Sequence, residues 1–271
     1  AGYSGTLTDK AIRELKLAAE DSTSSLYQAN KEVYSLLRYG VNVRARQGGN
    51  KEKVWLIDWG QPRNNQFAVA EEVTVKARST KRPDLVLYVN GIALGVIELK
   101  RSSVSIEKGI RQSLANQESI FIKSFFNTMQ LVISGNNTQG LRYGTILTPE
   151  KYYQEWREET DMEYDYKLDR HIAQLLNREH FLEIVKDFTL FDSGVKKVSR
   201  PHQYFGVKES QKRLGQKEGG IIWHTQGSGK SLTMVLLAKS IALSSILDYK
   251  IVLVTDRVDL DDQIYRTFHH C

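Results

Sequence analysis

Three ionisable side chains lie close together in an otherwise apolar stretch between residues 82 and 101. Asp84 stands just before the apolar run 85–89, and Glu98 and Lys100 stand at the end of the run 93–97. Carboxylates are hard oxygen ligands that suit Mg²⁺ or Mn²⁺, and a lysine beside them can orient or polarise a metal-bound water. The combination predicts a site for metal-assisted attack of water on a phosphodiester.

A β-hairpin must position these groups. Residues 85–89 and 93–97 are rich in strand formers, and the Asn90-Gly91 pair between them suits a tight turn with positive φ at both central residues. The antiparallel pairing of the two runs brings the start of the first strand beside the end of the second, so the charges converge at one end of the hairpin.

Within the second strand, side chains alternate between the faces of the sheet. Glu98 and Lys100 therefore point to the same face, whereas Leu99 points to the other and leaves its backbone carbonyl near the carboxylates. We expect Asp84, Glu98 and the Leu99 carbonyl to be the metal ligands. The alternative is a salt-bridged strand end on a solvated sheet face.

The segments around the hairpin predict one sheet flanked by helices. Helices are predicted at residues 10–18, 26–37 and 106–126. Further strands are predicted at residues 54–59, 67–75, 129–134 and 141–147, the last as an edge strand. Together with the hairpin they make a mixed sheet of at least four strands.

Residues 219–235 carry the most specific signal in the chain. An apolar segment at 221–223, predicted as a strand, runs into a glycine-rich loop, and Lys230 opens a helix. Backbone N–H groups in such a loop can wrap a phosphate, and the helix N-terminus adds a favourable dipole. We expect Lys230 to reach the β and γ phosphates of ATP and Ser231 to hold Mg²⁺. The predicted ATP contacts in the loop are Thr225, Gln226, Gly227, Ser228, Gly229, Lys230 and Ser231. The alternative is a chance surface turn, and His224 replaces the usual first glycine of the pattern.

The two halves of the chain carry two resemblances. Pro83-Asp84 with Glu98-Leu99-Lys100 resembles the motif of the PD-(D/E)xK nuclease superfamily, and the phosphate loop resembles that of superfamily 2 helicases. Those helicases read adenine with a glutamine upstream of the loop, the position of Gln203. They contact nucleic acid after the next strand, predicted here at 251–255, the position of Arg257. The alternatives are a helix-surface glutamine and a structural ion pair.

In this order and at this separation, the motifs look like the N-terminal part of the R subunit of type I restriction-modification enzymes. The resemblance implies an α/β fold: a PD-(D/E)xK nuclease domain followed by the start of a RecA-like P-loop domain. It implies a hydrolase that uses Mg²⁺ and ATP, translocates along double-stranded DNA and cuts it, together with methylation and specificity subunits. In that family a glutamine on the helix after the lysine supports the nuclease site. Gln112 matches it, but Asn116 stands at the tyrosine position of the pattern.

The predicted organisation is a nuclease domain at residues 1–150, a linker with helices at 151–197 and a truncated first motor lobe at 198–271. We expect a fragment that is unable to move along DNA, because a translocase needs two lobes to close on ATP. DNA-stimulated ATP hydrolysis by this polypeptide would contradict that expectation. The motor half should also expose an apolar sheet edge.

Composition is consistent with this assignment. The 271 residues carry a net charge of +6, which is compatible with a polyanionic partner. The single cysteine, Cys271, excludes internal disulfides and cysteine-based metal sites. No apolar run is long enough for a membrane span and no secretion signal is evident, so we expect a cytoplasmic protein. Two alternatives stay open: a repair helicase-nuclease that acts on DNA ends, and a catalytically silent nuclease fold that docks on DNA.

Overall fold

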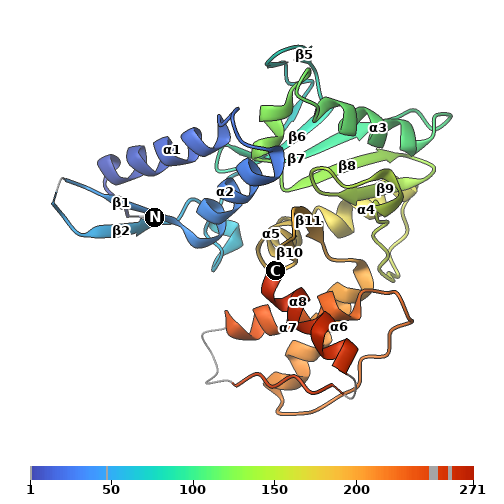
Figure 1. Ribbon diagram of the computed structural model, residues 1–271. Helices are drawn as coiled ribbons and strands as arrows, with labels where there is room; N and C mark the ends of the chain where they lie inside the picture. The colour runs from blue at the N-terminus through green and yellow to red at the C-terminus, as the bar shows by residue number, and fades with distance from the viewer. Residues whose placement is uncertain (1, 47, 244–249, 256–257) are drawn as a thin grey trace. The chain divides into compact units, whose positions relative to one another are not determined.

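A computed structural model describes residues 2–46, 48–243, 250–255 and 258–271. The chain divides into two compact units, Ala1–Leu182 and Glu183–Cys271 (Figure 1). The division falls inside helix α5 (Arg178–Asp187). The domain limits expected at residues 150 and 197 stay predictions.

The first unit is built on a five-stranded sheet (Figure 1). Its strands, in spatial order, are β3 (Phe67–Glu71), β6 (Leu85–Val89), β7 (Ile92–Leu99), β8 (Leu131–Asn136) and β9 (Gly140–Gly144). All neighbours are antiparallel except β7 and β8, which run parallel. A parallel pair needs a crossover, and the connection here contains helix α3 (Ile106–Asn116). The predicted mixed sheet and its edge strand are therefore confirmed.

The central hairpin has the predicted turn. Asn90 has a φ of 51° and Gly91 a φ of 79°, the left-handed conformation that this dipeptide tolerates. A register shift between Leu87 and Tyr88 marks a β-bulge in the middle of the pair. On the side of the bulge away from the turn, Leu85 pairs with Ile97. This pairing sets the register at the end of the hairpin that carries the charged residues.

An apolar core joins β6, β7 and β8 to α3 and to helix α2 (Leu26–Tyr39). Its buried members are Leu26, Val86, Val96, Ile106, Ile110, Ile122, Phe126, Met129, Val132, Ile146 and Tyr153. Asn30 of α2 ties the segment after α3 to this core, because its amide donates hydrogen bonds to the carbonyls of Phe126 and Met129 at 3.0 and 2.8 Å. Burial of this apolar surface is the main source of stability in the unit.

The predicted strand at 54–59 is wrong. The chain is extended only up to Val54, in β2 (Lys51–Val54), which pairs with β1 (Val41–Arg44) in a separate two-stranded sheet. Asp58 then forms a turn, since its carboxylate accepts hydrogen bonds from the backbone of Gly60 and Gln61 at 3.1 and 2.8 Å. Local side-chain bonding of this kind competes with a strand.

Two further boundaries differ from expectation. The predicted helix at 106–126 ends at Asn116, where the chain turns back so that the N–H of Ile122 bonds the Asn116 carbonyl at 3.2 Å. The predicted strand at 67–75 stops at Glu71, because Glu72 has a φ of 48°. A separate small hairpin follows, formed by β4 (Val75–Lys76) and β5 (Thr80–Lys81).

The other elements of the first unit are short or peripheral. They are α1 (Gly5–Ala19), α4 (Lys167–Leu175) and the 3₁₀ turns η1 (Pro62–Asn64), η2 (Lys123–Asn127) and η3 (Glu150–Tyr152).

The second unit is mainly helical. Its elements are the hairpin β10 (Thr189–Asp192) and β11 (Val195–Val198) and the helices α6 (Pro201–Gly215), α7 (Lys230–Ala242) and α8 (Val258–His270). Among the helices that the structure describes in either unit, none combines the length and the apolar composition needed to cross a bilayer.

The predicted strands at 221–223 and 251–255 are not strands. Ile221 is 90% exposed, Trp223 88% and Val254 87%. A strand needs a hydrogen-bonded neighbour, and no described residue pairs with either segment. Apolar side chains are thus exposed here as expected, but they do not line the edge of a sheet.

Candidate functional site

The structure brings Asp84 and Glu98 together at one end of the β6–β7 hairpin. Since Leu85 pairs with Ile97, the residue before β6 lies across from Glu98. The Asp84 carboxylate accepts a hydrogen bond from the N–H of Leu99, with Oδ2 and N 2.7 Å apart. This bond holds the carboxylate against the end of β7.

Glu98 is the most perturbed acid of the site. Its residue is only 1% exposed, although it carries a carboxyl group. Burial, and then the nearby charge of Asp84, raise the pKa of Glu98 to about 7, while the charge of Lys100 acts in the opposite direction. A buried carboxyl group beside a second carboxylate is therefore kept near its titration point at neutral pH.

Gln112 links the Glu98 carboxyl group to the Lys100 ammonium. Its Nε2 donates to Glu98 Oε2 at 2.8 Å, and its Oε1 accepts from Lys100 Nζ at 2.9 Å. Lys100 Nζ itself lies 3.7 Å from Glu98 Oε2. Helix α3 positions Gln112, and its first turn is capped by Ser105, whose hydroxyl accepts from the N–H of Glu107. The structure thus connects Asp84, Glu98, Lys100, Gln112 and the backbone of Leu99 in one cluster.

Sequence reasoning missed Ser134 and Gly109. The Ser134 hydroxyl is fully buried in β8 and lies 3.1 Å from the carbonyl oxygens of both Glu98 and Ile106, so it joins the site strand to the start of α3. A Cβ on Gly109 would stand 2.1 Å from Ser134 Oγ, so only glycine allows α3 to approach β8 this closely. A glycine inside a predicted helix was the only signal that could have pointed to this contact.

The donor set fits a hard divalent cation in part. Among the described residues, no group of three or more histidine, cysteine, aspartate or glutamate side chains could hold a metal ion. The site offers two carboxylates whose mutual repulsion contributes to the raised pKa of Glu98, and a divalent cation between them would relieve that repulsion. Magnesium sites commonly use only one or two carboxylates and complete the shell with water. The Leu99 carbonyl as a further ligand stays a prediction.

The glycine-rich loop of the second unit makes a tight turn before α7. Gly227 has a φ of 77° and Gly229 a φ of 89°, and α7 begins at Lys230. The Lys230 ammonium donates hydrogen bonds to the carbonyls of His224 and Thr225 at 3.1 and 3.0 Å. The loop therefore curls around the lysine. Ser228 is buried, Ser231 is half-buried, and Thr225, Gln226, Gly227 and Lys230 are exposed.

Helix α6 holds this loop from its buried side. Gln203 is 3% exposed, and its Nε2 donates to the Gly229 carbonyl at 3.0 Å while its Oε1 accepts from the N–H of Arg200 at 2.9 Å. A ring nitrogen of His202 lies 3.0 Å from the Ser228 carbonyl. Adenine reading by Gln203 stays a prediction, and it would require the amide to give up these bonds. Arg257 lies outside the described residues.

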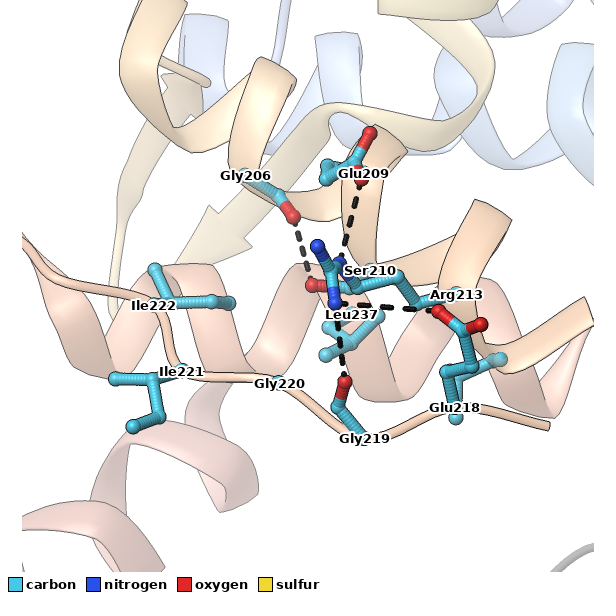
Figure 2. Close-up of a pocket in the computed structure, with 11 residues that line it drawn as sticks. Gly206, Glu209, Ser210, Arg213, Glu218, Gly219, Gly220, Ile221, Ile222 and Leu237 are labelled. Carbon is cyan, nitrogen blue, oxygen red and sulfur yellow. Dashed lines mark hydrogen bonds and ion pairs between the residues drawn. The ribbon is translucent and has the colours of Figure 1, made fainter. Parts of the chain in front are cut away.

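A cavity of about 510 Å³ lies between α6, residues 218–222 and Leu237 of α7 (Figure 2). The Arg213 guanidinium reaches into it and is held by Glu209 at 3.3 Å, by the Gly219 carbonyl at 3.4 Å and by Glu218 at 4.0 Å. None of the predicted ATP contacts lines this cavity. It is therefore separate from the glycine-rich loop.

Family models match both halves of the chain. A family model described as type I restriction enzyme R protein N terminus matches residues 4–152, and a model described as SWI2/SNF2 ATPase matches residues 202–271.

Curated relatives point the same way. The type I restriction enzyme HindI endonuclease subunit of Haemophilus influenzae is 31% identical over 94% of this chain and 26% of its own length. The putative type I restriction enzyme MjaIXP endonuclease subunit of Methanocaldococcus jannaschii is 26% identical over 95% of this chain and 28% of its own length. The chain thus spans about a quarter of the length of these relatives. Since the first family model covers more than half of the sequence, the chain belongs to the family of the N-terminal region of type I restriction enzyme R proteins.

Proposed function

We propose that the first unit is a Mg²⁺-dependent endonuclease that hydrolyses phosphodiester bonds of double-stranded DNA. The observation that carries the proposal is the buried Glu98, set beside Asp84 and bonded through Gln112 to Lys100. The names of the curated relatives, which are restriction endonuclease subunits, support it. In this proposal the fold is of the PD-(D/E)xK type.

Each residue has a definite role in the proposed reaction. The chemistry that Mg²⁺ supplies when bound is neutralisation of charge on the phosphate and a lower pKa for the attacking water. Asp84, Glu98 and the Leu99 carbonyl would be the groups that hold the ion. Lys100 would orient the attacking water, and Gln112 fixes the lysine relative to Glu98 through its bonds of 2.9 and 2.8 Å.

We further propose that the second unit binds ATP at its P-loop, Thr225 to Ser231. The positive φ of Gly227 and Gly229, the start of α7 at Lys230 and the SWI2/SNF2 match support this role. Lys230 would exchange its bonds to loop carbonyls for bonds to phosphate oxygens, and Ser231 would hold the magnesium of the nucleotide. In the complete restriction assembly, ATP-dependent translocation along DNA would be coupled to cleavage. The methylation and specificity subunits would be the partners, and the cytoplasm the place of action.

The test compares Asp84→Ala and Lys100→Ala with controls on exposed helix faces, Glu14→Ala in α1 and Lys31→Ala in α2. Each variant is assembled with the other restriction subunits, and cleavage of plasmid DNA is measured with Mg²⁺ alongside DNA binding. We expect both site variants to lose cleavage while they still bind DNA, and both controls to cut normally.

The remaining alternatives correspond to other outcomes. Unchanged cutting by both site variants would indicate a silent nuclease fold that serves only for docking. Degradation of free DNA ends without the other subunits would indicate a repair helicase-nuclease instead.

A further inference from the structure

A strongly basic loop rises directly from the proposed nuclease site. It runs from Glu72 to Asp84 and is closed at its base, because the N–H of Glu72 bonds the Asp84 carbonyl at 2.9 Å. Between these two residues the sequence contains Lys76, Arg78, Lys81 and Arg82 and no acid. We call residues 73–83 the basic loop. Figure 1 shows its strand β5 on a projection beyond the five-stranded sheet.

The inner side of the basic loop is anchored to the protein. Val75 of β4 packs against the core cluster that includes Ile106 and Ile110 of α3. Lys81, its partner in β5, lies with its ammonium 4.3 Å from the ring centre of Phe121. Val75 therefore packs against the same cluster as α3, the helix that carries Gln112.

The outer side of the loop presents cations to solvent. Lys76 pairs with Thr80 and so points away from the anchored side, while Arg78 lies at the turn. Both are exposed, and among the described residues neither has an ion pair or a side-chain hydrogen bond. Arg82, 58% exposed, is paired with Glu72 at 2.6 Å. Among the described residues, the exposed positive charge of the loop that has no ion-pair partner is therefore concentrated on Lys76 and Arg78.

These positions suit the backbone of a DNA duplex. Arg78 is six residues from Asp84, so its Cα lies at most about 20 Å from that of Asp84. Duplex DNA carries a negative charge about every 1.7 Å along its axis, so a duplex with a phosphate at the site would bring others within reach of the loop.

We propose that the basic loop binds the phosphate backbone of DNA through Lys76 and Arg78 and so positions the duplex beside Asp84 and Glu98. The inference deepens the proposed nuclease function and rests on it. Contacts to phosphate carry no sequence information, so the basic loop should bind duplex DNA of any sequence. It is a positioning surface, separate from the groups that act on the scissile bond.

The test measures binding of a short fluorescent duplex by anisotropy across roughly 50 to 200 mM salt, without divalent cations so that no cleavage occurs. The variant is Lys76→Ala with Arg78→Ala. The matched control is Arg46→Ala with Lys51→Ala, an equal loss of charge from exposed residues at the tip of the β1–β2 hairpin, which packs on α1 through a different cluster.

We expect the loop variant to bind on the order of 10-fold more weakly for each lost contact at 0.1 M salt, with a salt slope smaller by about 2. The control should bind like the original protein. Equal weakening in both variants, or no weakening in the loop variant, would overturn the proposal. Thermal unfolding should be unchanged in both, and Arg78→Lys, which keeps the charge, should retain binding.

The two proposals fail in distinguishable ways. If the loop variant loses DNA binding but the original protein never cuts DNA in the assembled complex, DNA binding by the basic loop is supported and the nuclease function is refuted. If Asp84→Ala abolishes cutting while the loop variant binds and cuts normally, the nuclease function is supported and DNA binding by the basic loop is refuted. Selective loss of binding to an acidic peptide, with duplex binding intact, would identify a protein partner and also overturn the proposal.

Discussion

Replacement of Glu98 by glutamine should make the first unit more stable at alkaline pH and leave it nearly unchanged at acidic pH. Glutamine keeps the shape of the protonated side chain and an oxygen that can accept the 2.8 Å hydrogen bond from Gln112. It removes only the possibility of a buried charge next to Asp84. The substitution therefore isolates the free-energy cost of ionising Glu98.

The magnitude follows from the two pKa values. In the unfolded chain Glu98 ionises near its ordinary value of 4.5, whereas in the folded unit its pKa is about 7. Between these values the folded form keeps a proton that the unfolded form has lost, so the free energy of unfolding falls as pH rises through this window and then levels off. The raised pKa corresponds to about 3 kcal/mol.

The assay is thermal unfolding of both proteins between roughly pH 5 and pH 8, below and above the raised pKa. At pH 8 we expect the Glu98→Gln variant to be more stable by about 2–3 kcal/mol, or on the order of 5–10 °C in Tm. At pH 5, just above the ordinary pKa of 4.5, the difference should shrink to about 1 kcal/mol or less. Added Mg²⁺ should raise the Tm of the original protein at pH 8 and leave that of the variant largely unchanged, because a ligand that binds only the folded form stabilises it.

A stability difference that stays constant from pH 5 to pH 8 would refute this reasoning, because it would show that Glu98 does not titrate in that window. A variant less stable than the original at pH 8 would show that the ionised carboxylate has partners that outweigh its burial.

Three other substitutions test further parts of the chain. Burial acts to raise the pKa of Glu155, but neighbouring cations led by Lys167 outweigh it and lower that pKa to about 2. The stability gained from the ionised carboxylate is therefore present above about pH 4.5 and is lost as pH falls toward 2. Glu155→Gln should lower the free energy of unfolding by about 2–3 kcal/mol at pH 7, measured by urea unfolding. Gly109→Ala should destabilise the first unit by about 1–3 kcal/mol and weaken DNA cleavage, because its Cβ would stand 2.1 Å from Ser134 Oγ and push α3 from the sheet. Lys230→Ala should weaken ATP binding by roughly 10- to 100-fold in calorimetry, the effect of one charge-assisted hydrogen bond.

Each of these has a matched control. Glu159→Gln removes an exposed acid near Glu155 and should leave urea unfolding unchanged at both pH values. Gly5→Ala adds a methyl group in α1 where nothing lies within 4 Å, so it should be neutral or slightly stabilising. Lys250→Ala removes an exposed lysine outside the loop and should leave ATP binding intact. A control that behaves like its partner variant would mean that the named contact is not the cause.

The sequence by itself determined the features that depend on neighbours along the chain. Asn90-Gly91 predicted a turn with positive φ, and alternation along a strand placed Glu98 and Lys100 on one face. The start of α7 at Lys230 followed from the glycine before it. These features rest on local backbone conformation, which a few adjacent residues decide.

Tertiary structure alone decided which of these features become strands and how the site is tuned. Residues 221–223 and 251–255 have strand-forming side chains, yet they form no strand, since a strand also needs a partner that sequence pattern cannot supply. The raised pKa of Glu98 likewise depends on burial under α3 and on Asp84, which lies fourteen residues away along the chain. The fit of Gly109 against Ser134, which sets the distance between α3 and the sheet, is equally non-local. Burial and close packing join residues distant in sequence, so they appear only when the chain is folded.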